Sequence, residues 1–230
     1  MNRVATDLDV GLLAEHVTLF SPNNPDGRAV LFTHGYGANA DGYSEFSEAC
    51  SRLGATCLTV DLLSHGKSSG DREDLTIQDY VDGLSAAYDH LASQPKVDAS
   101  RIGTMAGSFG AYLSVLLSAE RPVESMLLRV PALYPDGLKD VPRRNFNTDD
   151  VLCMEPHVDN SALKTVRDFG GKVLLVSSGK DEIIMSSTID AYAQAINNGE
   201  HIRMDGASHV LDISAREVFK GILLAWAAEL

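Results

Sequence analysis

Ser108, Asp181 and His209 are the residue types that together carry out nucleophilic catalysis, and they occur in that order along the chain. Ser108 lies between Gly107 and Gly110 in the stretch RIGTMAGSFGAYLS, directly after an apolar run. Asp181 and His209 follow in the stretches SSGKDE and DGASHV. A serine hydroxyl is a weak nucleophile until a neighbouring base removes its proton, and a histidine oriented by a carboxylate is a common base. These residues therefore predict a catalytic triad if the fold brings them together.

Each of the three residues also has an ordinary structural interpretation. The pattern small-x-Ser-x-Gly around Ser108 occurs in many turns. Asp181 is also consistent with a solvated loop acid, and Glu182 is a rival for its role one residue further on. His209 precedes VLDISAREV, which has the composition of a helix start. The elements around these residues must decide between the interpretations.

Short apolar runs alternate along the chain with stretches of helical period. The apolar runs are residues 16–20, 29–34, 55–61, 101–106, 125–130, 172–178 and 200–205. The helical stretches are residues 41–53, 77–92, 109–119, 186–196 and 213–229. Strands that are apolar throughout and alternate with helices indicate a parallel sheet buried on both faces. We predict a single α/β domain over residues 1–230, with a doubly wound, mostly parallel sheet and an antiparallel edge formed by the first run or two.

The ends of these predicted strands carry the polar residues. Ser108, Asp181 and His209 each follow a different apolar run. Ligands bind outside the carboxyl ends of the strands in doubly wound sheets, and these ends share one edge. Among the seven histidines, His209 is the one that follows the last strand, and His34 and His65 fit better as braces of loop backbone. The order of elements therefore favours the catalytic interpretation of all three residues.

From about residue 28 to the C-terminus the chain resembles the α/β-hydrolase family. The order nucleophile, acid, histidine matches that family. The stretch HGYG (residues 34–37, the HGYG loop) looks like its oxyanion loop, DLLSHGKS (61–68) is similar to a segment after the preceding strand, and KDEII is similar to its acid loop. Within the family, the chain looks most like the small carboxylesterases and feruloyl esterases grouped with serine aminopeptidases and monoglyceride lipases.

The resemblance implies a role for each site residue. Ser108 would be the nucleophile, His209 the general base and Asp181 the group that orients His209. The backbone N–H groups of Tyr36 and Phe109 would form the oxyanion hole. The family's mechanism needs no metal or organic cofactor, and the sequence has no cluster of metal-ligand spacing. In the family, the nucleophile lies in a tight strand-to-helix turn, the nucleophile elbow, with the pattern small-x-Ser-x-Gly. This chain has Ala106 at the small position before Ser108, where a methyl group still allows strand and helix to approach closely.

Residues 131–159, which we call the cap segment, lie between a predicted strand and a predicted helix that begins at the candidate caps Asn160 and Ser161. The segment is short and rich in Pro, Asp and Asn, so we expect a loop or one small helix. Feruloyl esterases of the resembled group carry a larger insertion here, and we therefore expect hydroxycinnamate esters to be poor substrates. We predict substrate contacts from the cap residues Tyr134, Phe146 and Met154, and a solvated charged pair at Arg143 and Arg144.

The bulk composition limits the partners of this chain. Its 230 residues carry a formal net charge of −13, which disfavours binding to nucleic acid and to anionic membrane surfaces. Acidic residues interrupt the first sixteen positions, where a signal peptide has an unbroken apolar core, so the expected location is cytoplasmic. The three cysteines have no metal-like spacing. The expected partner is a small-molecule ester.

These observations together predict a cofactor-independent serine carboxylesterase that acts on small or medium esters through an acyl-enzyme. Two alternatives use the same triad, namely an acyl thioesterase and a serine aminopeptidase or amidase. A third belongs to another class, a ligand-binding module of the same fold without catalysis. The presence of all three triad residues weighs against that module, because ligand binding alone does not need them.

Overall fold

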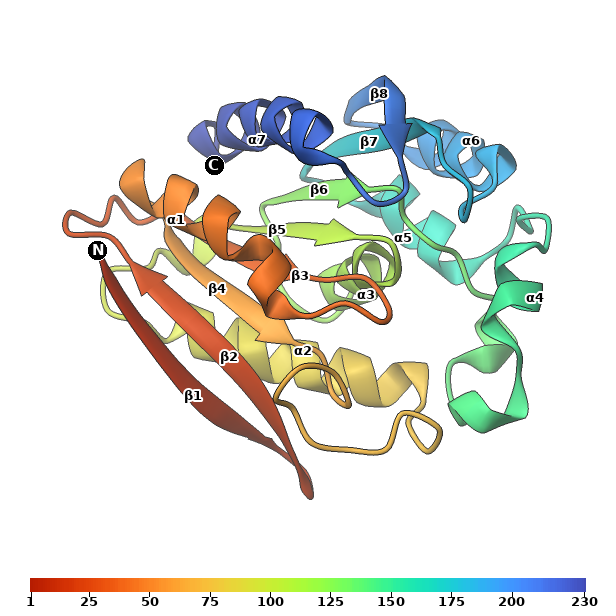
Figure 1. Ribbon diagram of the computed structural model, residues 1–230, viewed down its shortest axis with the longest axis horizontal. Coiled ribbons are helices and arrows are strands. Elements are labelled where there is room, and N and C mark those ends of the chain that lie inside the picture. The colour runs from red at the N-terminus through yellow and green to blue at the C-terminus, as the bar shows by residue number, and fades with distance from the viewer.

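One eight-stranded sheet forms the centre of the computed structural model, which describes residues 1–230 (Figure 1). Its strand order is β1-β2-β4-β3-β5-β6-β7-β8. The strands are β1 (Asn2–Val10), β2 (Leu13–Ser21), β3 (Ala29–Thr33), β4 (Thr56–Asp61), β5 (Ile102–Gly107), β6 (Ser125–Arg129), β7 (Lys172–Lys180) and β8 (Gly199–Ser208). Strand β2 pairs antiparallel with β1 and β4, and all other pairs are parallel. The predicted mostly parallel α/β fold is confirmed.

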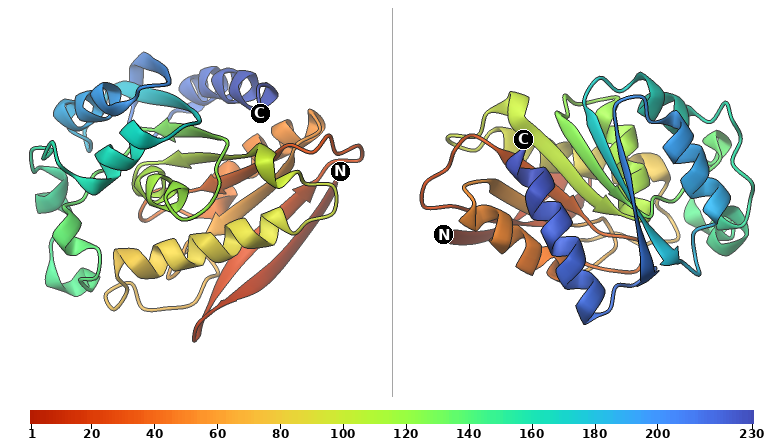
Figure 2. Two further views of the ribbon diagram at one scale, coloured as in Figure 1. Left: turned by 180° about the vertical axis from the view of Figure 1, so that it is seen from behind. Right: turned by 90° about the horizontal axis from the view of Figure 1, so that it is seen from above.

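Helices cover both faces of the sheet and bury its apolar side chains. Helices α1 (Ser44–Arg52) and α7 (Ile213–Ala228) lie on one face. The other face is covered by α2 (Ile77–Ala92), α3 (Phe109–Ser118), α5 (Ser161–Asp168) and α6 (Ser186–Ala195). Figure 2 shows the molecule from behind, with α2 and α3 nearest the viewer, and from above, with α7 beside α1. None of the helices combines the length and the hydrophobicity that crossing a bilayer requires.

Strand β1 is the one strand that our list of apolar runs lacked. Its side chains are mostly exposed because it is an edge strand with one neighbour, so it has no apolar signature. It forms a hairpin with β2 in which Val10 pairs with Leu13 around a turn at Gly11 and Leu12. Gly11 has a φ of 60°, which glycine adopts without strain. The predicted antiparallel edge is present, and the first apolar run forms part of it as β2, but its second strand is β1, while the second apolar run is the central parallel strand β3.

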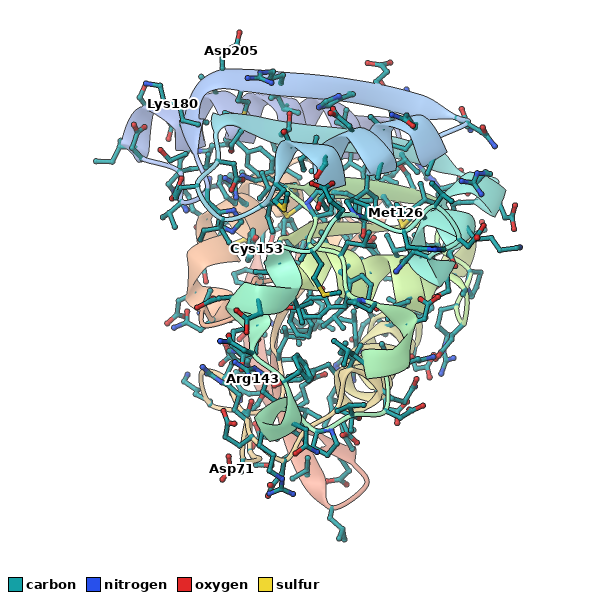
Figure 3. The ribbon with its side chains drawn as sticks, turned by 90° about the vertical axis from the view of Figure 1, so that its right-hand side faces the viewer. Asp71, Met126, Arg143, Cys153, Lys180 and Asp205 are labelled. Carbon is teal, nitrogen blue, oxygen red and sulfur yellow. The ribbon has the colours of Figure 1, made fainter.

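The cap segment contains three short helical pieces, namely η3 (Asp136–Leu138), η4 (Arg143–Asn145) and α4 (Thr148–Leu152). It lies beyond the carboxyl ends of the central strands (Figure 1). Figure 3 faces this edge and shows Arg143 and Cys153 on the segment, between Lys180 above and Asp71 below. The backbone N–H groups of Arg143 and Arg144 donate to carbonyls of the loop before α2, at 3.0 Å each. These two hydrogen bonds tie η4 to the loop before α2.

Candidate active site

Ser108 occupies a tight turn between β5 and α3. Its φ of 54° and ψ of −120° lie in a region that non-glycine residues rarely adopt. Its N–H donates to the carbonyl of Arg129 at 2.9 Å, and its carbonyl accepts from Ala132 at 3.1 Å. Helix α3 approaches β3 so closely that a Cβ at Gly110 would lie 2.4 Å from the carbonyl oxygen of His34. The turn therefore needs a glycine at this position, and the surrounding backbone holds Ser108 in its strained conformation.

Asp181 and His209 meet at the ends of β7 and β8. Both carboxylate oxygens of Asp181 lie 3.0 Å from Nδ1 of His209. One of these oxygens also accepts from the backbone N–H groups of Ile183 and Ile184, at 2.9 and 2.8 Å. Burial alone would raise the pKa of Asp181, but hydrogen bonds from His209 and these N–H groups favour the carboxylate, so its pKa lies below the ordinary value. Asp181 is thus held ionised against the imidazole.

Glu182, the rival acid, contacts the same loop at a different place. Its Oε2 accepts from the backbone N–H of His209 at 3.2 Å and does not contact the imidazole ring. Neighbouring side chains in extended backbone point in opposite directions, so only one of the two acids can face the ring. In this structure that acid is Asp181.

The HGYG loop crosses directly over Ser108. A Cβ at Gly35 would lie 3.1 Å from Cβ of Ser108. The backbone N–H of Tyr36 and the backbone N–H of Phe109 make no hydrogen bond within the protein. Two unpaired donors therefore lie beside the serine, which is the requirement for stabilising negative charge on an acyl oxygen.

Two buried histidines brace the HGYG loop. His34 Nε2 accepts from the N–H of Leu62 at 3.0 Å, and its Nδ1 contacts the carbonyl of Gly35 at 2.8 Å. His65 Nε2 accepts from the N–H of Gly37 at 3.1 Å. A ring nitrogen that accepts a hydrogen bond carries no proton, so each ring is neutral and protonated on Nδ1. Burial lowers the pKa of His34 to about 4 and also lowers that of His65, which keeps both rings in this form.

Asp61, at the end of β4, ties the backbone just after the HGYG loop to the segment that follows this strand. Its Oδ1 accepts from the N–H of Ala40 at 2.7 Å, and its Oδ2 accepts from the N–H of Lys67 at 2.9 Å. The two imidazoles therefore hold the stretches HGYG and DLLSHGKS to one another, and the carboxylate holds DLLSHGKS to the backbone at Ala40.

A pocket of about 230 Å³ opens at Ser108, and we call it the serine pocket. Ser108 and His209 both lie in its wall, without a hydrogen bond between them in this structure. The sequence analysis did not identify its other polar and aromatic wall residues, which include Tyr43, Phe46, Arg129, Arg216 and Phe219. A signal for Arg129 was available, since it is a charged residue at the carboxyl end of the apolar run SMLLR.

The predicted substrate contacts Tyr134, Phe146 and Met154 are not in the wall of the serine pocket. Tyr134 is 3% exposed, and its ring packs edge-on against Phe109 with the centroids 5.4 Å apart. Tyr134 and Met154 instead line a separate cavity of about 470 Å³ within the cap segment. Phe146 packs against Tyr134, with ring centroids 6.5 Å apart. The three residues thus lie outside the wall of the serine pocket, and Tyr134 reaches the site only through its packing on Phe109.

The two cap arginines differ from each other. Arg144 is exposed and pairs with Asp74, as expected for a solvated charge. Arg143 was expected to be solvated too, but its guanidinium lies 5.8 Å from the ring centroid of Tyr36 and 5.3 Å from that of Phe146. Arg143 therefore packs on aromatic faces beside the HGYG loop.

Comparison with known proteins agrees with this fold. The family pattern described as serine aminopeptidase, S33, matches residues 24–146, a range that includes Ser108 and ends before Asp181 and His209. A monoglyceride lipase homolog of monkeypox virus is 29% identical over 123 residues, which are 51% of this chain and 42% of that protein. The chain spans less than half the length of the curated relatives it matches.

Solved structures share the fold at low sequence identity. Est1E from Butyrivibrio proteoclasticus with bound ferulic acid matches with a TM-score of 0.80 and 20% identity, over 98% of each chain. A thioesterase domain from the curacin biosynthetic pathway matches with a TM-score of 0.73 and 12% identity, over 97% of this chain and 100% of that one. Since the family pattern covers more than half of the chain and the architecture agrees with it, this protein belongs to the serine aminopeptidase S33 family of α/β hydrolases.

Proposed function

We propose that the protein is a serine carboxylesterase that hydrolyses small to medium carboxylic esters through an acyl-enzyme intermediate. The observation that carries this proposal is the geometry around one pocket. Ser108 and His209 both lie in the wall of this pocket, and a carboxylate oxygen of Asp181 lies 3.0 Å from Nδ1 of His209. The unpaired N–H groups of Tyr36 and Phe109 flank the serine.

In the proposed mechanism, His209 removes the proton of Ser108 as the hydroxyl oxygen attacks the acyl carbon. The N–H groups of Tyr36 and Phe109 stabilise the resulting oxyanion, and the loss of one such donor costs roughly 3–4 kcal/mol in other serine hydrolases. His209 then passes its proton to the leaving alcohol, and a water molecule releases the acid by the same steps. Ser108 and His209 are not hydrogen-bonded here, and such contacts often tighten only when substrate binds.

The decisive test is covalent labelling with a fluorophosphonate. We expect the wild-type protein to be labelled once and the Ser108→Ala variant not at all, with hydrolysis of 4-nitrophenyl butyrate reduced to near background. The control is Ser118→Ala, at the far end of the same helix, whose hydroxyl donates only to a carbonyl of its own helix. Turnover in Ser108→Ala equal to wild type would refute the proposal, and so would an unlabelled wild-type protein, which is the outcome expected of a non-catalytic binding module.

A matched panel of butanoyl substrates distinguishes the ester from the alternatives. The panel holds the acyl group constant and changes the leaving atom, with a 4-nitrophenyl ester, a thioester and a 4-nitroanilide. We expect kcat/KM to be highest for the ester. A thioester preferred over the ester by tenfold or more would identify a thioesterase, and efficient anilide cleavage would identify an amidase.

A further inference from the structure

Arg129 is a buried cation without a carboxylate partner. Arg129 is 8% exposed and lies in the wall of the serine pocket. One nitrogen, Nη2, makes all of its hydrogen bonds, to Ser178 Oγ and to the carbonyls of Ser208 and His209. Its Nε is buried and makes no hydrogen bond. No Asp or Glu oxygen lies within 4.0 Å of the guanidinium.

An unpaired charge in this position is costly. Taking an ionised side chain out of water costs several kcal/mol unless a counter-charge and hydrogen bonds replace the lost hydration. Burial lowers the pKa of Arg129. The negative charges of Asp181 and Glu182 oppose this and raise the pKa, but neither carboxylate contacts the guanidinium. Since a guanidinium keeps its proton under ordinary conditions, Arg129 remains charged in the pocket wall without a carboxylate in direct contact, and an anion entering the pocket would supply one.

Two further donors face the same pocket. Arg216 lies on the first turn of α7, whose start is near the carboxyl ends of the strands (Figure 1). It stacks 4.7 Å from the ring centroid of Phe46, and one nitrogen donates to the carbonyl of Gly42. The Tyr43 hydroxyl makes no hydrogen bond in the protein, and burial raises its pKa, so it remains a donor. A chain with a net charge of −13 thus has two guanidiniums and a phenol in the wall of one small pocket.

The position of His209 identifies which part of a substrate would reach these donors. The base that deprotonates the serine also protonates the leaving group, so the leaving group lies beside the imidazole. Val210, Leu211 and Arg216 line the serine pocket together with His209. A leaving group that receives its proton from His209 can therefore occupy this pocket.

We propose that the serine pocket binds the leaving group of the substrate and that this leaving group carries a carboxylate, held by Arg129, Arg216 and Tyr43. Carboxylates accept two parallel hydrogen bonds from a guanidinium, which suits the unpaired donors of this pocket. This inference rests on the proposed ester hydrolysis for its reaction, although the anion site itself does not depend on turnover.

The kinetic test compares two esters of equal shape. They are 4-(butanoyloxy)benzoate and 4-(butanoyloxy)benzamide, which differ only in whether the leaving group carries a negative charge. At fixed ionic strength, we expect wild-type kcat/KM to be about 10- to 100-fold higher for the benzoate, the effect of one or two charge-assisted hydrogen bonds. We expect Arg216→Gln to reduce this ratio about tenfold. Arg216 makes no hydrogen bond to Ser108, Asp181 or His209, and the uncharged benzamide ester reports any general effect of the substitution on turnover.

The control is Arg167→Gln, which makes the same change in net charge on an exposed residue of α5. We expect it to keep the wild-type ratio. A wild-type ratio near or below one, or a ratio equally reduced in both variants, would overturn the inference. Arg129→Lys adds a further test, because a purely structural role in holding the Ser208 and His209 carbonyls predicts equal losses on both esters. We expect a larger loss on the benzoate.

A binding measurement separates this inference from the proposed function. Calorimetric titration of the wild-type protein with 4-hydroxybenzoate and 4-hydroxybenzamide needs no turnover. We expect the benzoate to bind more tightly, and Arg216→Gln to weaken its binding about tenfold while Arg167→Gln leaves it unchanged. If neither ester were hydrolysed but this pattern held, the esterase proposal would fail and the anion site would stand. Equal binding of both compounds would overturn the anion site.

Discussion

Ser108 and Val130 both adopt positive φ angles, 54° and 42°, at the ends of neighbouring strands. This conformation is unusual for any residue with a side chain and is more so for the β-branched Val130. Hydrogen bonds hold both residues in place, since Ser108 donates to the carbonyl of Arg129 and Val130 donates to the carbonyl of Val176. Strain of this kind persists where the surrounding structure enforces it, and it accumulates at functional sites. One of the two strained residues is the candidate nucleophile, and the other directly follows the buried Arg129.

The acid beside His209 can be tested by a matched pair of substitutions. Asp181→Asn removes the charge that favours one tautomer of the imidazole, and the equivalent change lowers turnover about ten-thousandfold in a serine protease. Glu182→Gln keeps an oxygen that can accept from the His209 N–H, so we expect most activity to remain. The measurement is turnover of 4-nitrophenyl butyrate at neutral pH. A crippled Glu182→Gln with an active Asp181→Asn would assign the acid to Glu182.

His34 makes stability depend on pH. Its pKa in the folded protein is about 4, below the ordinary value of 6.5, so the unfolded chain binds the proton more readily. The stabilisation is therefore complete above pH 6.5 and is lost as the pH falls toward about 4, by about 3 kcal/mol. We expect the urea midpoint to fall over this range, and to fall less steeply in His34→Gln than in wild type.

The control for this measurement is His157→Gln, because the His157 side chain is 78% exposed. We expect the pH dependence of this variant to match that of wild type. A His34→Gln variant with the same slope as wild type would show that another group is responsible for the loss of stability.

The β5–α3 turn is the structural element on which the site depends. Helix α3 is buried along most of its length and packs its first turn against the backbone at the end of β3. We expect Gly110→Ala to destabilise the protein by about 1–3 kcal/mol, because the new methyl group would overlap the carbonyls of Thr33 and His34. Activity should fall as well, since any movement of α3 also moves the N–H of Phe109. Thermal unfolding and ester turnover are the measurements.

Gly221→Ala is the matched control for this prediction. Gly221 lies within α7, and nothing lies within 4 Å of the position its Cβ would take. We expect this substitution to stabilise the protein by about 0.5–1 kcal/mol, because alanine favours helix interiors over glycine. If Gly110→Ala were as stable as Gly221→Ala, the close approach of α3 to β3 would not be required.

The arrangement of cavities in the whole molecule bears on acyl-chain preference. The serine pocket, which we assign to the leaving group, measures about 230 Å³, below the roughly 300–1,000 Å³ of sites that enclose drug-sized ligands, so it does not also enclose a long acyl chain. The larger cavity of the cap segment has Tyr134 and Met154 in its wall but not Ser108. A long acyl chain would therefore remain largely in water and would not gain the ~0.8 kcal/mol that each buried methylene supplies.

We expect specificity constants for 4-nitrophenyl esters to be highest for short to medium acyl groups, and ferulate release from methyl ferulate to be slow. Specificity constants that increase steadily from butyrate to palmitate would contradict this prediction, as would efficient release of ferulate.

The sequence alone predicted seven of the eight strands, the long helices and the order of the candidate triad. Helix α2 has the residues 77–92 that its apolar period predicted, and Asn160 caps α5 as proposed, by accepting from the N–H of Ala162. These features are local, since periodicity and capping depend on residues a few positions apart. The meeting of the strand ends also followed from the sequence, because the carboxyl ends of parallel strands share one edge of the sheet.

Only the tertiary structure decided what surrounds Ser108. It placed Arg129, Tyr43 and Arg216 in the wall of the serine pocket, and it placed Tyr134 and Met154 in a different cavity. These residues come from four distant parts of the chain and share no local pattern. Which face of a strand or helix points toward a pocket depends on its packing against elements remote in sequence, and this long-range geometry leaves no periodic signal in the residues themselves.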